Sequence, residues 1–444
     1  MKASWIWFLL GLGGSLQIVA SLSFAELFAI VAAPIIFVHQ YALLRKHGMM
    51  GLIWMSFFVF IGCVVSSSMN GTPLPFVLRG LAATILMPCS IVVAHWILNK
   101  DMGGFKWYLL GLGLSQILST FIFQHSFEID ALANGAEGRA AVTDIMAGPL
   151  YWVSRLGPFF MLIPRGWYLQ CPTVVCVLMP LGLAGFSLLT TVSGRSAALS
   201  AIGAAVLVVL GGKTMVTIKR RVCNRFWRVV LVSGLFVFAF HATYRYTASS
   251  GLLGSEALEK YEWQSKGSSS ILKLLMGGRM DSFCGLLACK DKPIIGFGPW
   301  AMDRGGYVEE FLARYADRED YEQYVKERRF YAARGMSVLN LIPGHSHIVG
   351  FWLWYGAVGL LFWLYAICLV VRYLKSDCFA VPQMFMWLAA GVPAFMWNVF
   401  FSPFSDRFGT MLFLTACLMV RAVRKGTMQL PERMKIEMLR YERP

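Results

Sequence analysis

The chain has 444 residues, of which 57% are hydrophobic and 14% are charged. A soluble domain carries about 45–50% apolar and about 25% charged residues, so this composition excludes an ordinary soluble protein and predicts a membrane protein. The net charge of +16 does not indicate a nucleic-acid partner, because the longest polar segment, residues 247–344, holds 13 Lys and Arg against 13 Asp and Glu. The positive excess lies in short loops and in the tail, which is typical of basic residues that set membrane topology.

Twelve apolar runs are long enough to form membrane-spanning helices. They cover residues 5–22, 25–44, 51–69, 76–98, 105–124, 148–165, 171–191, 196–212, 228–246, 348–371, 380–400 and 406–423. The break between the first two runs and the run at 148–165 are the least regular, so eleven or thirteen helices stay open as alternatives. We expect an all-α polytopic membrane protein with about twelve transmembrane helices and one large loop before the tenth.

Basic residues near the ends of these runs indicate the orientation of the chain. They are Arg45, Lys46, Lys100, Lys106, Lys213, Lys219, Arg220, Arg221, Arg225, Arg228, Arg372, Lys375, Arg421, Arg424 and Lys425. If the helices alternate in direction, all of these lie on one side, which is then cytoplasmic and holds both termini. Residues 1–246 would form helices 1–9, 247–344 the outer loop, 345–423 helices 10–12 and 424–444 a basic cytoplasmic tail.

The outer loop has recognisable local patterns. We expect a short helix over about 271–290, a turn at Pro293–Pro299, and an amphipathic helix within 307–334, where aromatic and charged residues alternate at helical spacing. The acidic pair Glu309 and Glu310 fits either a bound cation or a solvated helix face, and the solvated face is the simpler interpretation.

Two histidines, His345 and His347, lie where the outer loop meets the apolar run at 348–371. Imidazole titrates near neutral pH, so a histidine at this membrane surface could be the general base for a lipid-borne substrate. The alternative is that both are interfacial residues that bind headgroups or backbone.

Three arginines stand near the predicted outer ends of membrane helices. Arg195 and Arg407 lie in outer turns, and Arg279 lies at a glycine break within the short loop helix. The planar guanidinium can bind phosphate oxygens in a bidentate manner. The alternative for each one is an interfacial arginine that extends to lipid headgroups. Because Arg195, Arg279 and His345 share one predicted face, they suit a membrane-anchored phosphate ester. The cysteines are scattered through apolar runs without zinc-like spacing, so no metal site is expected.

Several stretches resemble the O-antigen ligase and O-antigen polymerase superfamily of bacterial envelope glycosyltransferases. His345 precedes Gly356 and Gly359 at the spacing of the family's histidine–glycine motif, which favours His345 over His347. The stretches Gly278-Arg279, Lys292–Pro299 and Ser193–Leu199 are similar to further family motifs, as is the large loop before the tenth helix. The sequence departs from the pattern at Ser346, where Asn is usual, and at Trp354, where Glu is frequent.

The resemblance implies a metal-independent, inverting transfer of a glycan from undecaprenyl pyrophosphate to an acceptor hydroxyl at the periplasmic face of the bacterial inner membrane, with no cofactor. His345 would be the catalytic base, Arg195 and Arg279 would bind the pyrophosphate, and His347 and Arg407 would support them. The acceptor is either lipid A core or another lipid-linked glycan, so ligase and polymerase both stay open. A flippase for lipid-linked glycan is the alternative, but the predicted helices are nearly free of charge, which favours a surface reaction.

Overall fold

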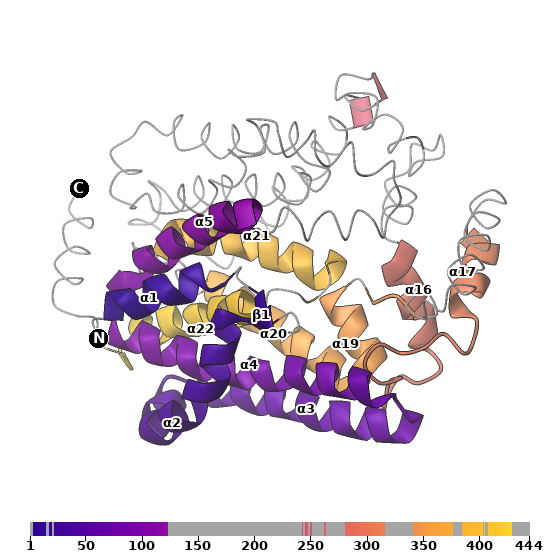
Figure 1. The fold of residues 1–444 in the computed structure, drawn as a ribbon, viewed down its shortest axis with the longest axis horizontal. Coiled ribbons are helices and arrows are strands. Elements are labelled where there is room, and N and C mark those ends of the chain that lie inside the picture. Colours follow the sequence, from indigo (N-terminus) through magenta and orange to yellow (C-terminus); the bar gives the residue numbers. More distant parts are fainter. Residues whose placement is uncertain are drawn as a thin grey trace.

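A computed structural model describes residues 3–14, 17–19, 22–122, 280–315, 341–344, 346–375, 384–402, 404 and 407–428, with a few isolated positions between 242 and 262. The protein is mostly helical (Figure 1). Within these ranges four helices are long and apolar enough to cross a membrane: α2 (Phe24–Lys46), α3 (Met50–Asn70), α4 (Leu74–Lys100) and α20 (Ala357–Lys375). This confirms the prediction of a helical, membrane-embedded protein. The runs predicted over 148–246 lie outside the described residues, apart from three isolated positions at the end of the last run.

The first apolar run is not one helix. Helix α1 (Ala3–Leu12) covers only its first part, and two short antiparallel strands follow, β1 (Gln17–Val19) and β2 (Leu22–Ser23). The expected helix over 5–22 therefore ends early, at a stretch that contains Gly11, Gly13 and Gly14. Glycine costs about 1 kcal/mol relative to alanine in a helix interior, so three glycines in four residues favour this early end.

Helix α1 packs closely on α5 (Phe105–Ile122), which follows the short 3-10 helix η1 (Met102–Gly104). A Cβ atom on Gly11 would lie 2.1 Å from the carbonyl oxygen of Tyr108, and one on Gly111 would lie 2.3 Å from that of Phe8. These glycines let the two backbones touch, as small residues do between membrane helices.

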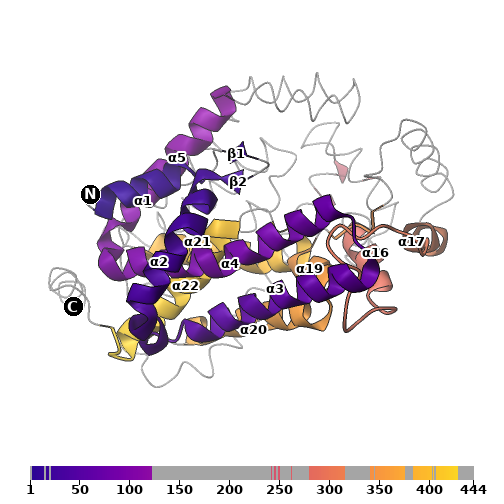
Figure 2. The ribbon, with the colours of Figure 1, turned by 60° about the horizontal axis from the view of Figure 1, so that its bottom comes forward.

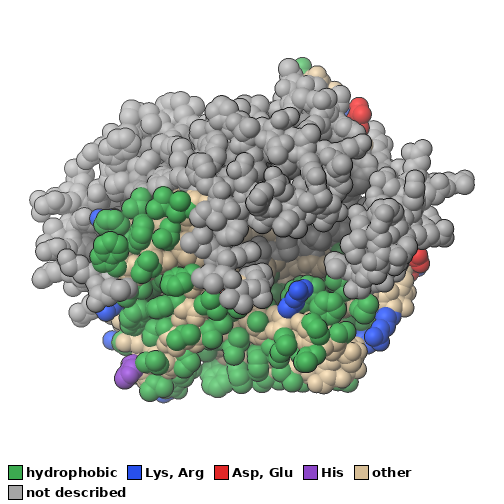
Figure 3. Space-filling view, viewed as in Figure 1, with side chains coloured by type: hydrophobic (Ala, Val, Ile, Leu, Met, Phe, Trp, Pro, Cys, Tyr) green, Lys and Arg blue, Asp and Glu red, His purple; other side chains and the backbone are tan. Residues whose placement is uncertain are grey.

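Helix α4 is the centre of the described bundle. It contacts α2, α3 and α22 (Arg407–Arg424), and it is the most buried of the four candidate spans. Figure 2 shows α3 lying along α4. The outer face of α2 exposes Val31, Ile35 and Val38, each more than 60% accessible, and the described surface in Figure 3 is largely hydrophobic. Apolar side chains exposed to this extent face lipid in a membrane-embedded protein.

The tenth predicted run, 348–371, is divided into two helices. Helix α19 (His347–Tyr355) ends at Gly356, which has φ of 68°, and α20 begins at Ala357. Helix α21 (Phe385–Phe401) and α22 follow, and α20 packs on α3 and α22. A Cβ atom on Gly51 of α3 would lie 2.5 Å from the hydroxyl of Tyr365 on α20, so this helix pair is also closely packed.

The described part of the predicted outer loop forms α16 (Met280–Ala288) and α17 (Tyr307–Tyr315), joined by an irregular segment. Helix α16 packs on α17 and on α19. Cys284 and Cys289 are both buried and are not joined to each other in a disulfide.

The ends of the described helices gather into two opposite sets. At one, here called the loop end, α3 ends at Asn70, α22 begins at Arg407, and the segment between α16 and α17 packs on the bundle. At the other, here called the basic end, His47 after α2 contacts His95 of α4, with Nδ1 and Nε2 2.9 Å apart. The Lys and Arg residues of the basic end are Arg45, Lys46, Lys100, Lys106, Arg372, Arg421, Arg424 and Lys425. These residues lie together at one end of the bundle. They belong to the set of basic residues that the sequence predicts on one side of the membrane.

Candidate functional site

The segment between α16 and α17 is bound to the helix break at Gly356. The amide of Ala357 donates to the carbonyl of Ile294 over 3.0 Å, and the amide of Phe297 donates to the carbonyl of Leu353 over 2.7 Å. The amide of Gly298 donates to the carbonyl of Trp354 over 3.0 Å. Breaking a helix frees backbone donors and acceptors that are costly to bury unpaired, and this segment satisfies several of them. The two stretches that carry the family resemblance near His345 are therefore in direct contact.

Glycine is required at two points of this contact. A Cβ atom on Gly356 would lie 2.0 Å from the carbonyl oxygen of Ile294, and one on Gly296 would lie 2.6 Å from the amide nitrogen of Gly356. Both residues have positive φ, 68° and 76°, which is the region that glycine enters without a steric penalty. The glycines of Gly296-Phe297-Gly298 thus serve close backbone packing, in line with the turn that the sequence predicts there.

The end of α3 also binds both the segment 292–299 and the helix break at Gly356. The amide nitrogen of the Asn70 side chain donates to the carbonyl of Gly296 over 3.0 Å, and the Ser66 hydroxyl donates to the carbonyl of Trp354 over 2.7 Å. The ammonium of Lys292 donates to the side-chain oxygen of Asn70. Polar groups of α3 and of the break between α19 and α20 therefore fix the position of the segment 292–299.

The residues around His345 are held firmly, although His345 itself lies outside the described residues. Ser346 is buried, caps α19 by accepting from the amide of Val349 over 3.3 Å, and donates to the carbonyl of Val399 over 2.9 Å. Gly344, which precedes His345, packs closely on Gly350. A Cβ atom on Gly350 would lie 2.8 Å from the carbonyl oxygen of Gly344. The serine that replaces the usual asparagine therefore serves as a helix cap and as a link to α21.

His347 is enclosed in the protein. Its side chain is 3% exposed, and Nδ1 lies 2.6 Å from the carbonyl oxygen of Ser402. Because a carbonyl only accepts, Nδ1 carries the proton in this hydrogen bond. The ring contacts Trp363 and Phe404 edge-on, with centroids 4.7 and 5.1 Å apart. This environment makes His347 a connection between the start of α19 and the end of α21.

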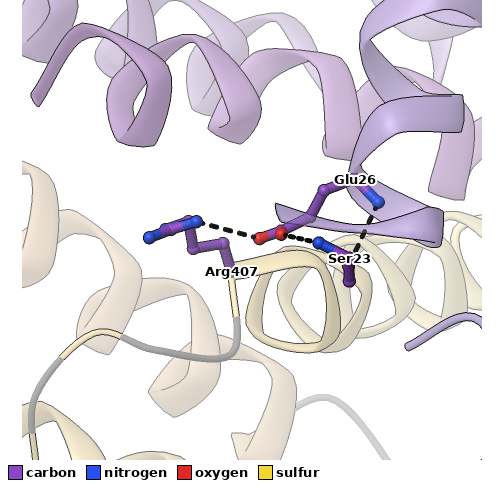
Figure 4. Close-up of polar contacts among 3 residues, drawn as sticks. All are labelled: Ser23, Glu26 and Arg407. Carbon is purple, nitrogen blue, oxygen red and sulfur yellow. Dashed lines mark hydrogen bonds and ion pairs between the residues drawn. The ribbon is translucent and has the colours of Figure 1, made fainter. Parts of the chain in front are cut away.

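Arg407 pairs with Glu26 near the loop end of the bundle (Figure 4). Nη1 of Arg407 lies 3.3 Å from Oε1 of Glu26, and the two side chains are 16% and 6% exposed. The other carboxylate oxygen, Oε2, accepts from the amide of Ser23 over 2.8 Å, while the Ser23 hydroxyl accepts from the amide of Glu26 over 3.3 Å. Glu26 thus completes a capping box at the start of α2 and neutralises a partly buried arginine.

Sequence reasoning did not single out Glu26. The signal was present, because Ser23-Phe24-Ala25-Glu26 before an apolar run is a capping-box pattern. An acidic residue at the start of a membrane helix also calls for a partner. The predicted residues Arg195 and Arg279 lie outside the described residues. Glu310 pairs with Arg314 over 2.6 Å on the exposed face of α17.

The described structure defines a helical membrane protein in which a loop segment is anchored into a broken helix at one end of the bundle. Comparison of the chain with models of protein families, with curated proteins and with solved structures finds no match.

Proposed function

We propose that the protein is a glycosyltransferase of the O-antigen ligase or polymerase type, which moves a glycan from undecaprenyl pyrophosphate to an acceptor hydroxyl. The observation that carries this proposal is the contact between Ile294 and Gly356. It joins the two resembling stretches, 292–299 and 345–359, at the end of the bundle opposite the basic cluster. With the basic end in the cytoplasm, the loop end would face the periplasm of a bacterial inner membrane, and both termini would be cytoplasmic.

The proposed reaction is a displacement at the anomeric carbon. The acceptor oxygen forms a bond to this carbon, the bond from the carbon to the pyrophosphate oxygen breaks, and the pyrophosphate leaves with the electron pair. His345 takes the proton of the acceptor hydroxyl, for which its imidazole has to be neutral. Arg195 and Arg279 stabilise the charge that develops on the pyrophosphate. Attack opposite the leaving group inverts the anomeric centre.

The described neighbours of His345 suit this role. Ser346 and Gly344 on either side of it are fixed by hydrogen bonding and close packing, and a catalytic side chain gains from a rigid support. His347 is a poor candidate for the base, because its Nδ1 is engaged by Ser402 and its ring is enclosed by aromatic residues. Burial of this kind keeps an acceptor hydroxyl away from the ring.

The test uses purified protein in detergent, a lipid-linked glycan and an acceptor, with release of undecaprenyl pyrophosphate as the measurement. A transferase releases it, whereas a flippase does not. His345→Ala and His345→Gln should each abolish release and still elute as folded protein in size-exclusion chromatography. His39→Ala is the matched control, because His39 is exposed on the lipid-facing helix α2. Release at the wild-type rate by folded His345→Ala would contradict the assignment of the base.

The acceptor is identified in a deletion strain. Surface polysaccharide is separated on a gel: loss of the whole ladder from the lipid A core indicates a ligase. Retention of a single repeat unit on the core indicates a polymerase that joins lipid-linked glycans.

A further inference from the structure

Trp300, in the segment bound to the helix break, has an unusual backbone. Its φ is 50°, and it is the one non-glycine residue with positive φ among the described residues. This region is sterically unfavourable for a bulky side chain and costs about 1–3 kcal/mol, which is retained where the surrounding structure imposes it. Such positions concentrate at ligand-binding sites, so Trp300 calls for an explanation.

The backbone on both sides of Trp300 is fixed. Pro299 packs on α4 at Gly80, where a Cβ atom would lie 2.6 Å from the Pro299 Cγ. The carbonyl of Ala301 accepts from the amide of Ile342 over 2.8 Å, and the next residue, Met302, pairs with Leu341 in an isolated β-bridge. These contacts leave the chain little freedom at Trp300 and set the direction of its side chain.

The Trp300 indole lies on the indole of Trp354. Their centroids are 4.9 Å apart and their planes differ by 19°, so the rings are stacked face to face. Trp354 belongs to α19, and its carbonyl is held by Ser66 and by the amide of Gly298. Both side chains are partly exposed. Trp354 covers one face of Trp300, and Trp300 as a whole keeps part of its surface accessible.

The stack is adjacent to the chain that leads into His345. The Cβ position of Gly344 lies 3.5 Å from Cζ2 of Trp354. Tryptophan at a membrane surface usually anchors a protein in the headgroup region, and isolated rings suffice for that. Membrane anchoring does not explain why two rings stack, why the backbone at Trp300 is strained, or why the stack lies next to Gly344.

We propose that the Trp300–Trp354 stack is a sugar-binding platform, on which one pyranose ring of the lipid-linked glycan lies. The C–H groups of a pyranose face form an apolar patch that packs on an indole face, and the indole edge leaves the sugar hydroxyls in contact with water. Trp354 supports Trp300 from behind and keeps its ring in place before the sugar arrives, which lowers the entropy cost of binding. That the sugar belongs to the transferred glycan rests on the proposed function.

The test compares two probes: undecaprenyl pyrophosphate that carries its glycan, isolated from the cells that make this protein, and undecaprenyl pyrophosphate without sugar. Binding of each to the full-length protein in detergent is measured for wild type, Trp300→Ala and Trp300→Gly. Both variants remove the ring, but only the glycine variant relieves the strain at positive φ, so Trp300→Gly should unfold at a higher temperature than Trp300→Ala. Trp54→Ala is the control, because Trp54 on α3 is 52% exposed and lies near the basic end.

We expect the wild type to bind the glycan-bearing lipid more tightly than the sugar-free lipid. Both Trp300 variants should bind the glycan-bearing lipid about three- to tenfold more weakly, as expected for loss of one aromatic stacking contact, and should bind the sugar-free lipid as before. Trp54→Ala should change neither affinity. The platform proposal would be overturned if both Trp300 variants bound the glycan-bearing lipid with wild-type affinity. It would also be overturned if they lost affinity equally for the two lipids.

The result separates the platform from the proposed transfer. Sugar-dependent binding that is lost in both Trp300 variants supports the platform, even if the wild type releases no undecaprenyl pyrophosphate. Release by the wild type together with unchanged binding in the variants overturns the platform and leaves the transferase proposal standing.

Discussion

Glu26 at the start of α2 and Arg407 at the start of α22 form a partly buried ion pair, although 381 residues separate them in the sequence. The pair ties the most lipid-exposed described span, α2, to a helix that packs on the centre of the bundle. A charge at this position needs a partner, because desolvation of an isolated ion is costly.

Neutralising Glu26 should therefore destabilise the protein. Glu26→Gln keeps the capping box, in which glutamine can replace glutamate, but leaves Arg407 without its counter-charge. We expect the free energy of unfolding in detergent to fall by about 3 kcal/mol, as for other buried pairs that lose one partner. The double variant Glu26→Gln with Arg407→Leu should recover most of this loss. An equal free energy of unfolding for Glu26→Gln and wild type would show that the ion pair does not contribute to stability.

Gly356 should be far less tolerant of substitution than Gly71, although both have positive φ. In Gly356→Ala the new Cβ would overlap the carbonyl of Ile294, so we expect a loss of about 3 kcal/mol or more from strain and displacement of the bound segment. A Cβ atom on Gly71 meets nothing within 4 Å, so Gly71→Ala should cost only the backbone term, about 1–2 kcal/mol. Thermal unfolding in detergent measures both, and equal losses would refute the role of the Gly356–Ile294 contact.

The hydrogen bond from His347 to Ser402 predicts a difference between two amides. Asparagine places its N–H group near the position of Nδ1, whereas glutamine places it near Nε2, where the described structure shows no such bond. His347→Asn should therefore be more stable than His347→Gln by about 1 kcal/mol, the typical net contribution of a hydrogen bond. Chemical denaturation of the two variants checks this, and the reverse order of stability would argue against the Nδ1 bond.

Cysteine labelling tests whether the loop end and the basic end lie on opposite sides of the membrane. Lys290→Cys, at the exposed loop end, should react with a membrane-impermeant maleimide in spheroplasts. Gly48→Cys, at the exposed basic end, should react only after permeabilisation. The native Cys289 should stay unlabelled, because burial raises the pKa of its thiol to about 12 and only the thiolate is nucleophilic. Labelling of both introduced cysteines in intact spheroplasts would contradict the proposed topology.

The extent of several helices could be predicted from the sequence. The runs 25–44, 51–69 and 76–98 correspond to α2, α3 and α4, because each is a long apolar stretch bounded by polar residues or turns. The runs 5–22 and 348–371 were predicted as single helices and are interrupted in the structure. Hydropathy alone does not reveal such breaks, since glycine counts as neutral in an apolar run and its cost depends on what packs against it.

The resemblance points to His345, Gly356 and Gly359 in the candidate site. The structure explains Gly356 by the approach of Ile294. The environments of His347 and Arg407 could not be predicted, because their partners, Ser402 and Glu26, are 55 and 381 residues away. His345, Arg195 and Arg279 lie outside the described residues and stay predictions.

The sequence by itself determined that this protein is membrane-embedded and helical, and it indicated where the basic residues collect. These properties follow from the transfer of contiguous apolar segments out of water, which depends on local composition. The tertiary structure alone decided that α19 ends at Gly356, that the segment 292–299 occupies this break, and that Glu26 pairs with Arg407. Each of these needs two distant parts of the chain in contact, because a buried backbone group or charge is stable only when a partner satisfies it.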